Sequence, residues 1–179
     1  MIENFILFAD YNTEMNARNF KAAQQLSGEE LLKNRGAFFG SILGTMNHLI
    51  VADTLWLQRI ATHPAQFSCL REISQLPKPD TLNLILYTEL TQWYERRIML
   101  DLTIQRLVVE ITNAELESVL FYHRTDGTPA NKRLKNILLH FFNHQTHHRG
   151  QISTLLFQAG VDVGVTDLLS LVPDATIAQ

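Results

Sequence analysis

The chain has 179 residues, of which 46% are hydrophobic and 18% are charged, and its formal net charge is −3. This length and composition are typical of one globular domain with a sizeable core, and they exclude an intrinsically disordered chain. The small negative charge argues against nucleic-acid binding, which usually relies on clustered Lys and Arg. We therefore expect a single domain over residues 1–179 with no nucleic-acid partner.

Membrane insertion and secretion are also disfavoured. No apolar run approaches the length needed to cross a bilayer, and the N-terminus lacks the basic start and small-residue cleavage site of a signal peptide. Cys69 is the only cysteine, which excludes an internal disulfide and a structural zinc site built on cysteines. We expect a cytoplasmic protein with no membrane contact, and we do not assign Cys69 as a nucleophile.

The first half of the chain predicts two helices. Between Glu3 and Leu26 apolar residues recur with a period close to 3.6, which indicates a helix rather than a strand. Ser27 then suits the cap of a short turn, since Glu30 follows it three residues later. The strongly apolar run from Ser41 to Ala61 predicts a second helix that ends before Pro64, as helices usually do ahead of a proline.

The second half predicts a long connection, two more helices and a turn between them. Residues 62–79 contain three prolines and precede a third helix from Leu82 to about Glu110. Residues 118–124 are rich in aromatic and β-branched side chains, and Asp126-Gly127 after them is a strong turn signal. A fourth helix is expected from about Leu134 to Phe157.

These elements predict an all-α protein. It is a four-helix bundle with a long crossover between the second and third helices and a short hairpin-like excursion before the fourth. Gly160 ends the last helix, and a tail with Leu168, Leu169 and Leu171 is expected to pack back on the bundle. Bundles build metal sites from side chains that face inward from neighbouring helices.

Histidines supply the main candidate site. His144 and His148 are four residues apart, so they lie one turn apart on the same face of the fourth helix. Two imidazoles placed in this way can bind one divalent ion. A third ligand must come from another helix, and the best candidate is His48 in the second. His140 and His147 are interpreted as surface groups or as groups that orient a ligand by hydrogen bonding.

Other polar residues near these histidines receive structural interpretations. Gln145 stands where a zincin helix carries the Glu of H-E-x-x-H, which disfavours a zincin peptidase. Asp53 lies off the face of His48 and is expected to pair with a cation or the backbone, with a general base as the outside alternative. Arg149 is expected in an interhelical salt bridge rather than bound to an anionic substrate, and Gly150 is expected to permit close helix approach.

Four patches of the sequence carry a family resemblance: Tyr11-Asn12 with Asn16, Asn47-His48 through Asp53 and Trp56, Asn143-His144 to Gln151, and Gly160-Val161-Asp162 through Asp167-Leu168-Leu169. In these patches the chain resembles the DinB superfamily of bacterial proteins, also called DinB/YfiT-like metalloenzymes. The resemblance implies a four-helix bundle that is commonly a homodimer and binds a divalent ion, such as zinc or nickel, through His48, His144 and His148. Members with known chemistry are metal-dependent transferases and isomerases that act with low-molecular-weight thiols.

Two functions are compatible with such a site. Three histidines leave at least one coordination position open, as in catalytic zinc sites. The first hypothesis is therefore a metal-dependent transferase, isomerase or hydrolase that activates a thiol or water. The second is a non-catalytic, stress-associated metal-binding protein in which the ion connects the second and fourth helices. Three imidazoles do not distinguish zinc from nickel, and no catalytic residue beyond the ligands is assigned.

Overall fold

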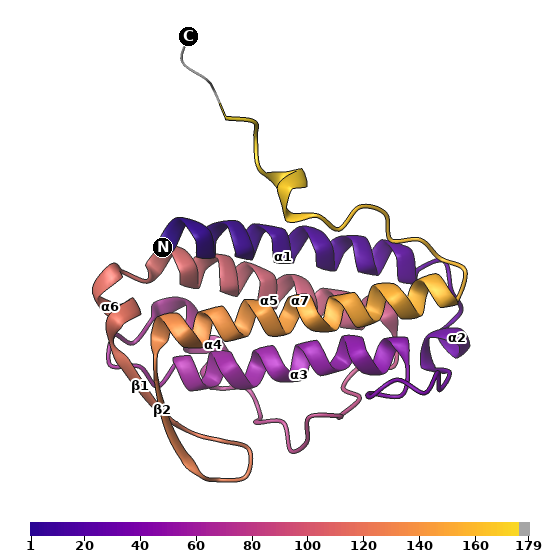
Figure 1. Cartoon of the computed structure of the whole chain (residues 1–179). Coiled ribbons are helices and arrows are strands. Elements are labelled where there is room, and N and C mark those ends of the chain that lie inside the picture. Colours follow the sequence, from indigo (N-terminus) through magenta and orange to yellow (C-terminus); the bar gives the residue numbers. More distant parts are fainter. Residues whose placement is uncertain (176–179) are drawn as a thin grey trace.

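The computed structural model describes residues 1–175, and its main body is a bundle of four long helices that lie side by side (Figure 1). They are α1 (Ile2–Ala23), α3 (Ile42–Ile60), α5 (Leu90–Glu110) and α7 (Leu134–Gln158). Helix α1 packs against α5 and α7, and α3 packs against the same two helices. The predicted all-α, four-helix bundle is confirmed.

Shorter elements connect the long helices. The predicted cap at Ser27 is confirmed, since its side chain accepts a hydrogen bond of 3.2 Å from the backbone N–H of Glu30. The predicted excursion before α7 is an antiparallel hairpin in which Val119 pairs with Arg133 and His123 with Pro129. The short elements are α2 (Gly28–Leu32), η1 (Ser68–Leu70), α4 (Arg71–Ser74), α6 (Asn113–Glu117), β1 (Val119–His123), β2 (Pro129–Arg133) and η2 (Leu168–Leu171).

The crossover between α3 and α5 returns along the length of the bundle, so the two helices run in the same direction (Figure 1). The side-chain contacts between the two helices occur in the same order along both, as expected for parallel helices. Trp93 Nε1 donates to the Met46 carbonyl at 2.9 Å, and further along both helices Arg97 Nη1 donates to Asp53 at 2.5 Å. The return path places the crossover on the outer side of α3, beside His48.

The third long helix begins at Leu90, whereas the sequence pattern predicts a start at Leu82. The buried side chain of Asn47 explains the difference. Its Oδ1 accepts hydrogen bonds of 2.9 Å from the backbone N–H groups of Leu86 and Tyr87, and its Nδ2 donates to the Tyr87 carbonyl at 2.9 Å. These bonds satisfy backbone groups that would otherwise need helical partners, so the segment stays non-helical.

Helix α3 is enclosed on nearly every side. Every residue from Ile42 to Leu55 is buried, because α2 and α4 pack against α3 in addition to α5 and α7. Because four helices pack around α3, most of its side chains must be apolar, as its sequence shows. It also means that the polar residues of this helix need partners, since an unpaired polar group is costly in a core.

Two local predictions are wrong. Leu169 is 76% exposed, because the short turn η2 directs only Leu168 and Leu171 toward the bundle, where they are half-buried. Gly150 lies on an exposed part of α7, where an added Cβ would meet no atom within 4 Å, so it does not serve close packing. The close approach occurs at Gly44, where a Cβ would clash with the Phe39 carbonyl oxygen.

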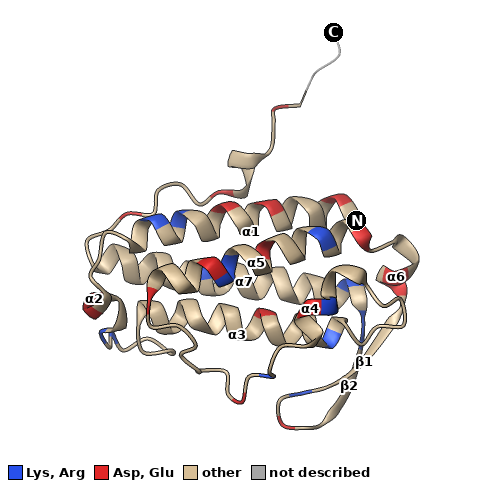
Figure 2. Ribbon diagram, turned by 180° about the vertical axis from the view of Figure 1, so that it is seen from behind, with Lys and Arg blue, Asp and Glu red and all other residues tan. Residues whose placement is uncertain are grey.

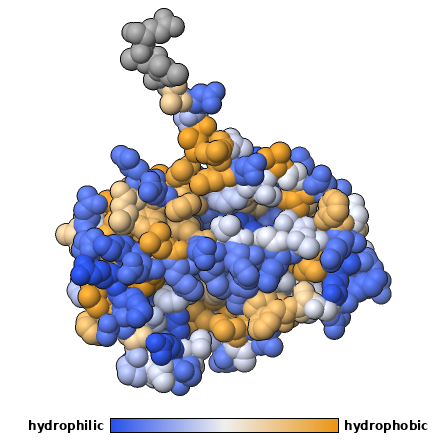
Figure 3. Space-filling view, viewed as in Figure 1, coloured by the Kyte–Doolittle hydropathy of each residue, from blue (hydrophilic) through white to orange (hydrophobic). Residues whose placement is uncertain are grey.

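The surface of the molecule is mixed in character. Lys and Arg are interspersed with Asp and Glu along the helices (Figure 2). On the face that carries α3 and α7, hydrophilic residues form a broad band, whereas hydrophobic residues gather where the C-terminal segment leaves the bundle (Figure 3). None of the described helices is long and apolar enough to cross a membrane.

Candidate metal centre

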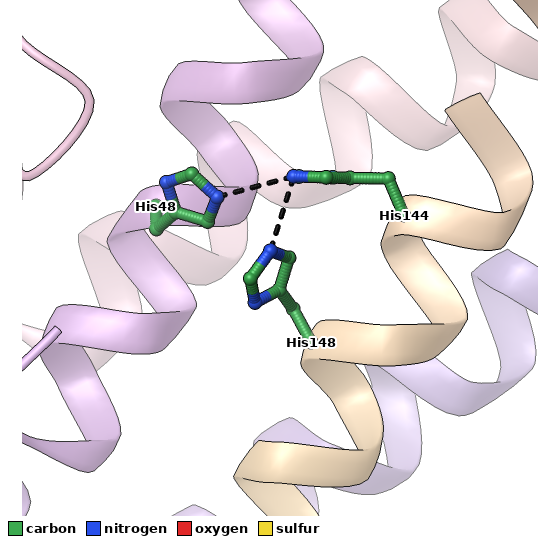
Figure 4. Close-up of side chains that lie close together, drawn as sticks. All are labelled: His48, His144 and His148. Carbon is green, nitrogen blue, oxygen red and sulfur yellow. Dashed lines mark hydrogen bonds between the residues drawn. The ribbon is translucent and has the colours of Figure 1, made fainter. Parts of the chain in front are cut away.

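Three histidines from two helices converge on one point. His48 on α3 and His144 and His148 on α7 direct their rings toward one another (Figure 4). His144 Nε2 lies 3.2 Å from His48 Nε2 and 3.0 Å from His148 Nε2. One nitrogen from each ring can be chosen so that all three lie within 4.8 Å of one another. The packing of α3 against α7 thus brings together the three residues singled out from the sequence.

The outer ring nitrogens determine which tautomers are present. His48 Nδ1 lies 2.8 Å from the Leu82 carbonyl oxygen, and His148 Nδ1 lies 2.7 Å from Gln151 Oε1. Both partners can only accept, so we assign a proton to each Nδ1, and each Nε2 then carries a free lone pair. His144 Nε2 has at most one proton and can satisfy only one of these two lone pairs. The arrangement leaves an excess of lone pairs, which suits a cation.

The spacing also suits a divalent ion. Zinc–nitrogen bonds are about 2.05 Å long, so two ligands of a tetrahedral zinc lie about 3.3 Å apart. The two shortest separations here, 3.0 and 3.2 Å, are close to this value. Hydrogen bonds from the opposite nitrogen to a carbonyl or amide oxygen are the usual support of a metal-binding histidine. The residues present therefore fit a three-histidine metal site.

Burial keeps the rings uncharged at neutral pH. It lowers the pKa of His48 to about 4, and it lowers the pKa of His144 to about 3 with help from the neighbouring His148 and His48. Burial also lowers the pKa of His148, although the hydrogen bond to Gln151 opposes this shift. Neutral imidazole is the form that binds a metal, so none of the three rings has to lose a positive charge first at physiological pH.

Comparison with known proteins identifies the family of the chain. The sequence profile of the DinB family matches residues 1–176. The chain belongs to the DinB family. The uncharacterized protein YizA of Bacillus subtilis (strain 168) is 27% identical over 146 residues, which cover 82% of this chain and 82% of YizA. No solved structure matches the chain. The family resemblance read from the sequence is confirmed.

Phe39 forms one wall of the centre in this DinB-family protein. Its ring stacks on His48 with centroids 3.8 Å apart and an interplanar angle of 15°, and it meets His148 edge-on at 5.5 Å. Gly44 permits this arrangement, because its missing side chain leaves room for the Phe39 carbonyl. Sequence reasoning missed Phe39, since nothing in the Gly36–Gly40 segment indicates that it folds over the histidines.

Gln151 was also missed, although its spacing held a signal. It follows His148 by three residues on α7, a separation at which helix side chains meet. Its Oε1 holds His148, and its Nε2 lies 3.3 Å from His147 Nε2. His147 thus supports a ligand indirectly, in agreement with the interpretation from the sequence. His140 is exposed and packs edge-on against Trp56 at a centroid distance of 5.1 Å.

A layer of buried polar residues lies between the helices beside the histidines. Asp53 Oδ2 accepts from Arg97 Nη1 at 2.5 Å and from Gln145 Nε2 at 2.7 Å, so the expected pairing of Asp53 with a cation is confirmed. Both contacts engage the carboxylate inside this layer, which argues against the general-base alternative. Asp101 lies on the other side of Arg97, with Oδ1 3.0 Å from Nη2. The layer links α3, α5 and α7 without a metal.

Arg149 belongs to the same layer, but the expected salt bridge is wrong. Its guanidinium donates to Asn12 Oδ1 and to Gln145 Oε1, and no described carboxylate lies within ion-pair distance. Burial lowers its pKa to about 10. Because amide oxygens and carboxylates both attract a guanidinium, the residue type alone does not reveal the partner. Arg149 connects α7 to α1, and Gln145 connects α7 to α3 through Asp53.

A cavity of about 310 Å³ opens beside the histidines. His48 and His144 form part of its lining, together with residues of α3, the crossover and the hairpin. A small molecule in this cavity would therefore lie against two of the three histidines. The cavity gives His48 and His144 a route to solvent.

Proposed function

We propose that this DinB-family protein is a metal-dependent enzyme whose ion, zinc or nickel, is held by His48, His144 and His148. The observation that carries the proposal is the convergence of three Nε2 atoms beside an open cavity. Structural zinc sites are usually closed by four protein ligands, whereas catalytic sites keep one position for water or substrate. Among residues 1–175, no fourth His, Cys, Asp or Glu joins the group.

The ion, when bound, would supply Lewis-acid activation of a small-molecule thiol or of water, for transfer, isomerisation or hydrolysis. The chain's own residues prepare the site. The Leu82 carbonyl and Gln151 fix the tautomers of His48 and His148, and Phe39 restricts the His48 ring. The cavity beside them has the volume to admit a small substrate.

The alternative is a structural ion that joins helices α3 and α7, which the origin of the ligands on two helices favours. The buried layer around Arg97 already connects these helices, so the enzyme hypothesis is preferred. Elemental analysis of untagged protein, with His48→Ala and His148→Ala variants, tests the metal site. We expect about one ion per chain in the unmodified protein and none in either variant.

Thermal unfolding with and without a chelator separates the two functions. The enzyme hypothesis expects metal removal to abolish thiol transfer or hydrolysis while most of the thermal stability remains. A collapse of the fold on chelation, with no activity in the loaded protein, would favour the structural ion. Protein that contains no metal and cannot be loaded would exclude both.

We also propose that the protein is a homodimer. Phe157, Val165 and Leu169 are 72%, 60% and 76% exposed, and hydrophobic surface gathers near the C-terminal segment (Figure 3). Exposed apolar surface of this kind often marks a protein interface. Light scattering after size exclusion should give the mass of two chains, and Leu169→Lys should shift it toward one.

A further inference from the structure

Arg59, near the end of α3, is held in an unusual way. Its guanidinium carbon lies 4.6 Å from the centroid of the Trp56 ring and 5.3 Å from that of Tyr122. Within residues 1–175 its guanidinium makes no hydrogen bond or ion pair with another side chain. Two aromatic rings therefore orient a half-buried cation whose N–H donors remain available.

The available donors face cavities rather than a protein partner. Arg59 lines both the cavity beside the histidines and an adjoining one of about 400 Å³. Arg124 lines the first and Lys78 the second, while no Asp or Glu lines either. A cavity lined by positively charged side chains and no acidic residue attracts anions, because its low-dielectric walls concentrate the positive electrostatic field.

The cavity connects Arg59 with the metal centre. Its lining runs along α3 from His48 through Ala52 and Leu55 to Arg59, and the helix rises about 16 Å between these two ends. His140 lies between the two ends, since it lines the same cavity and its ring centroid is 5.8 Å from that of His144. Burial lowers the pKa of His140, and the positive charge of Arg59 lowers it further, which shows that the two side chains lie close enough to interact.

We propose that this cavity binds a small organic carboxylate, with Arg59 holding the carboxylate and the other end of the molecule directed toward the histidines. Leu55, Trp56 and Tyr122 supply apolar surface for the carbon skeleton between the ends. A planar guanidinium matches a carboxylate with two parallel hydrogen bonds. The nearby end of α3 is its C-terminus, whose partial negative charge disfavours a doubly charged phosphate. The direction toward the ion rests on the proposed function, whereas the carboxylate site does not.

Calorimetric titration of metal-free protein with succinate tests the carboxylate site alone, since a bound zinc ion would itself attract carboxylates. Unmodified protein should bind succinate, and Arg59→Gln should weaken binding about tenfold or more, as loss of a charge-assisted hydrogen bond does. Arg71→Gln, which removes an exposed arginine of α4, should leave binding unchanged. No binding by the unmodified protein, or equal binding by Arg59→Gln, would overturn the proposal.

Zinc-loaded protein and two thiols of similar length test the complete arrangement. Unmodified protein should bind 6-mercaptohexanoate more tightly than 6-amino-1-hexanethiol, whose other end is cationic, and Arg59→Gln should lose this preference while it keeps its zinc. Tighter or equal binding of 6-amino-1-hexanethiol by the unmodified protein would overturn the proposal. Arg124→Gln, on the exposed hairpin, provides a second variant that should reduce the preference if Arg59→Gln does not fold. Succinate binding without any zinc uptake would reject the metal-dependent function and leave the carboxylate site standing.

Discussion

Asn47 pairs with both backbone polar groups of Tyr87. Its Oδ1 accepts from the Tyr87 N–H and its Nδ2 donates to the Tyr87 carbonyl, each at 2.9 Å, so one side chain imitates a neighbouring strand. This pairing fixes the crossover to α3 next to His48. Because the crossover also supplies the Leu82 carbonyl that orients His48, the buried Asn47 amide helps to position one of the three converging histidines.

Asn47→Ala should therefore reduce both stability and metal affinity. The substitution removes three hydrogen bonds to the backbone of Leu86 and Tyr87, and each such bond contributes about 0.5–1.5 kcal/mol, so we expect a loss of about 2 kcal/mol in the free energy of unfolding. Urea denaturation and zinc titration measure the two effects. Asn143→Ala is a matched control, because Asn143 precedes His144 as Asn47 precedes His48, but it is exposed. Equal effects of the two substitutions would contradict the role of Asn47.

The sequence predicts those features of the structure that depend on residues close together in the chain. The periodicity of the long helices and the four-residue spacing of His144 and His148 are visible in short windows, so both are found without a structure. The start of α5 is not local, because the state of residues 82–89 depends on Asn47, about 40 positions earlier in the chain. The partners of Arg149 are equally remote, and the sequence offers carboxylates and amides alike.

Gly44→Ala should disturb the centre through Phe39. A Cβ at this position would clash with the Phe39 carbonyl oxygen, so the segment before α3 must move and its stacking on His48 must change. Overpacking of this kind typically costs about 1–3 kcal/mol. Thermal unfolding and zinc affinity should both decrease. Gly150→Ala, in the middle of α7 with open space around it, should instead raise stability by up to about 1 kcal/mol. A neutral Gly44→Ala would show that Phe39 does not restrain His48.

Metal-free protein should lose stability as the pH falls. Burial lowers the pKa of His48 to about 4 and that of His144 to about 3, whereas an unfolded chain has histidines with a pKa of about 6.5. Below about pH 6.5 the unfolded chain gains protons that the folded chain does not, so the free energy of unfolding decreases from about pH 7 toward about pH 4. Urea denaturation at about pH 7 and about pH 5 measures the difference.

Two variants identify the source of this pH dependence. His48→Gln should reduce it, because one of the buried rings no longer titrates in the unfolded chain. His123→Ala removes an exposed histidine of the hairpin and should leave the difference as it is in the unmodified protein. A difference between the two pH values that His48→Gln leaves unchanged would contradict the burial of a neutral His48 at the centre.

Gln151→Ala should weaken metal binding with little effect on the fold. Its Oε1 fixes the His148 tautomer at 2.7 Å, and loss of such an outer hydrogen bond typically lowers metal affinity about 10- to 100-fold. Gln151 is half-buried near the surface of α7, so thermal unfolding of the metal-free protein should change little. Gln151→Glu should preserve the affinity, because a carboxylate oxygen also accepts from Nδ1–H, whereas Gln151→Met, of similar size but without an acceptor of comparable strength, should behave like Ala. Zinc titration of the three variants against a chromophoric chelator distinguishes these outcomes. Equal affinity in Gln151→Glu and Gln151→Met would show that the hydrogen bond does not prepare His148 for the ion.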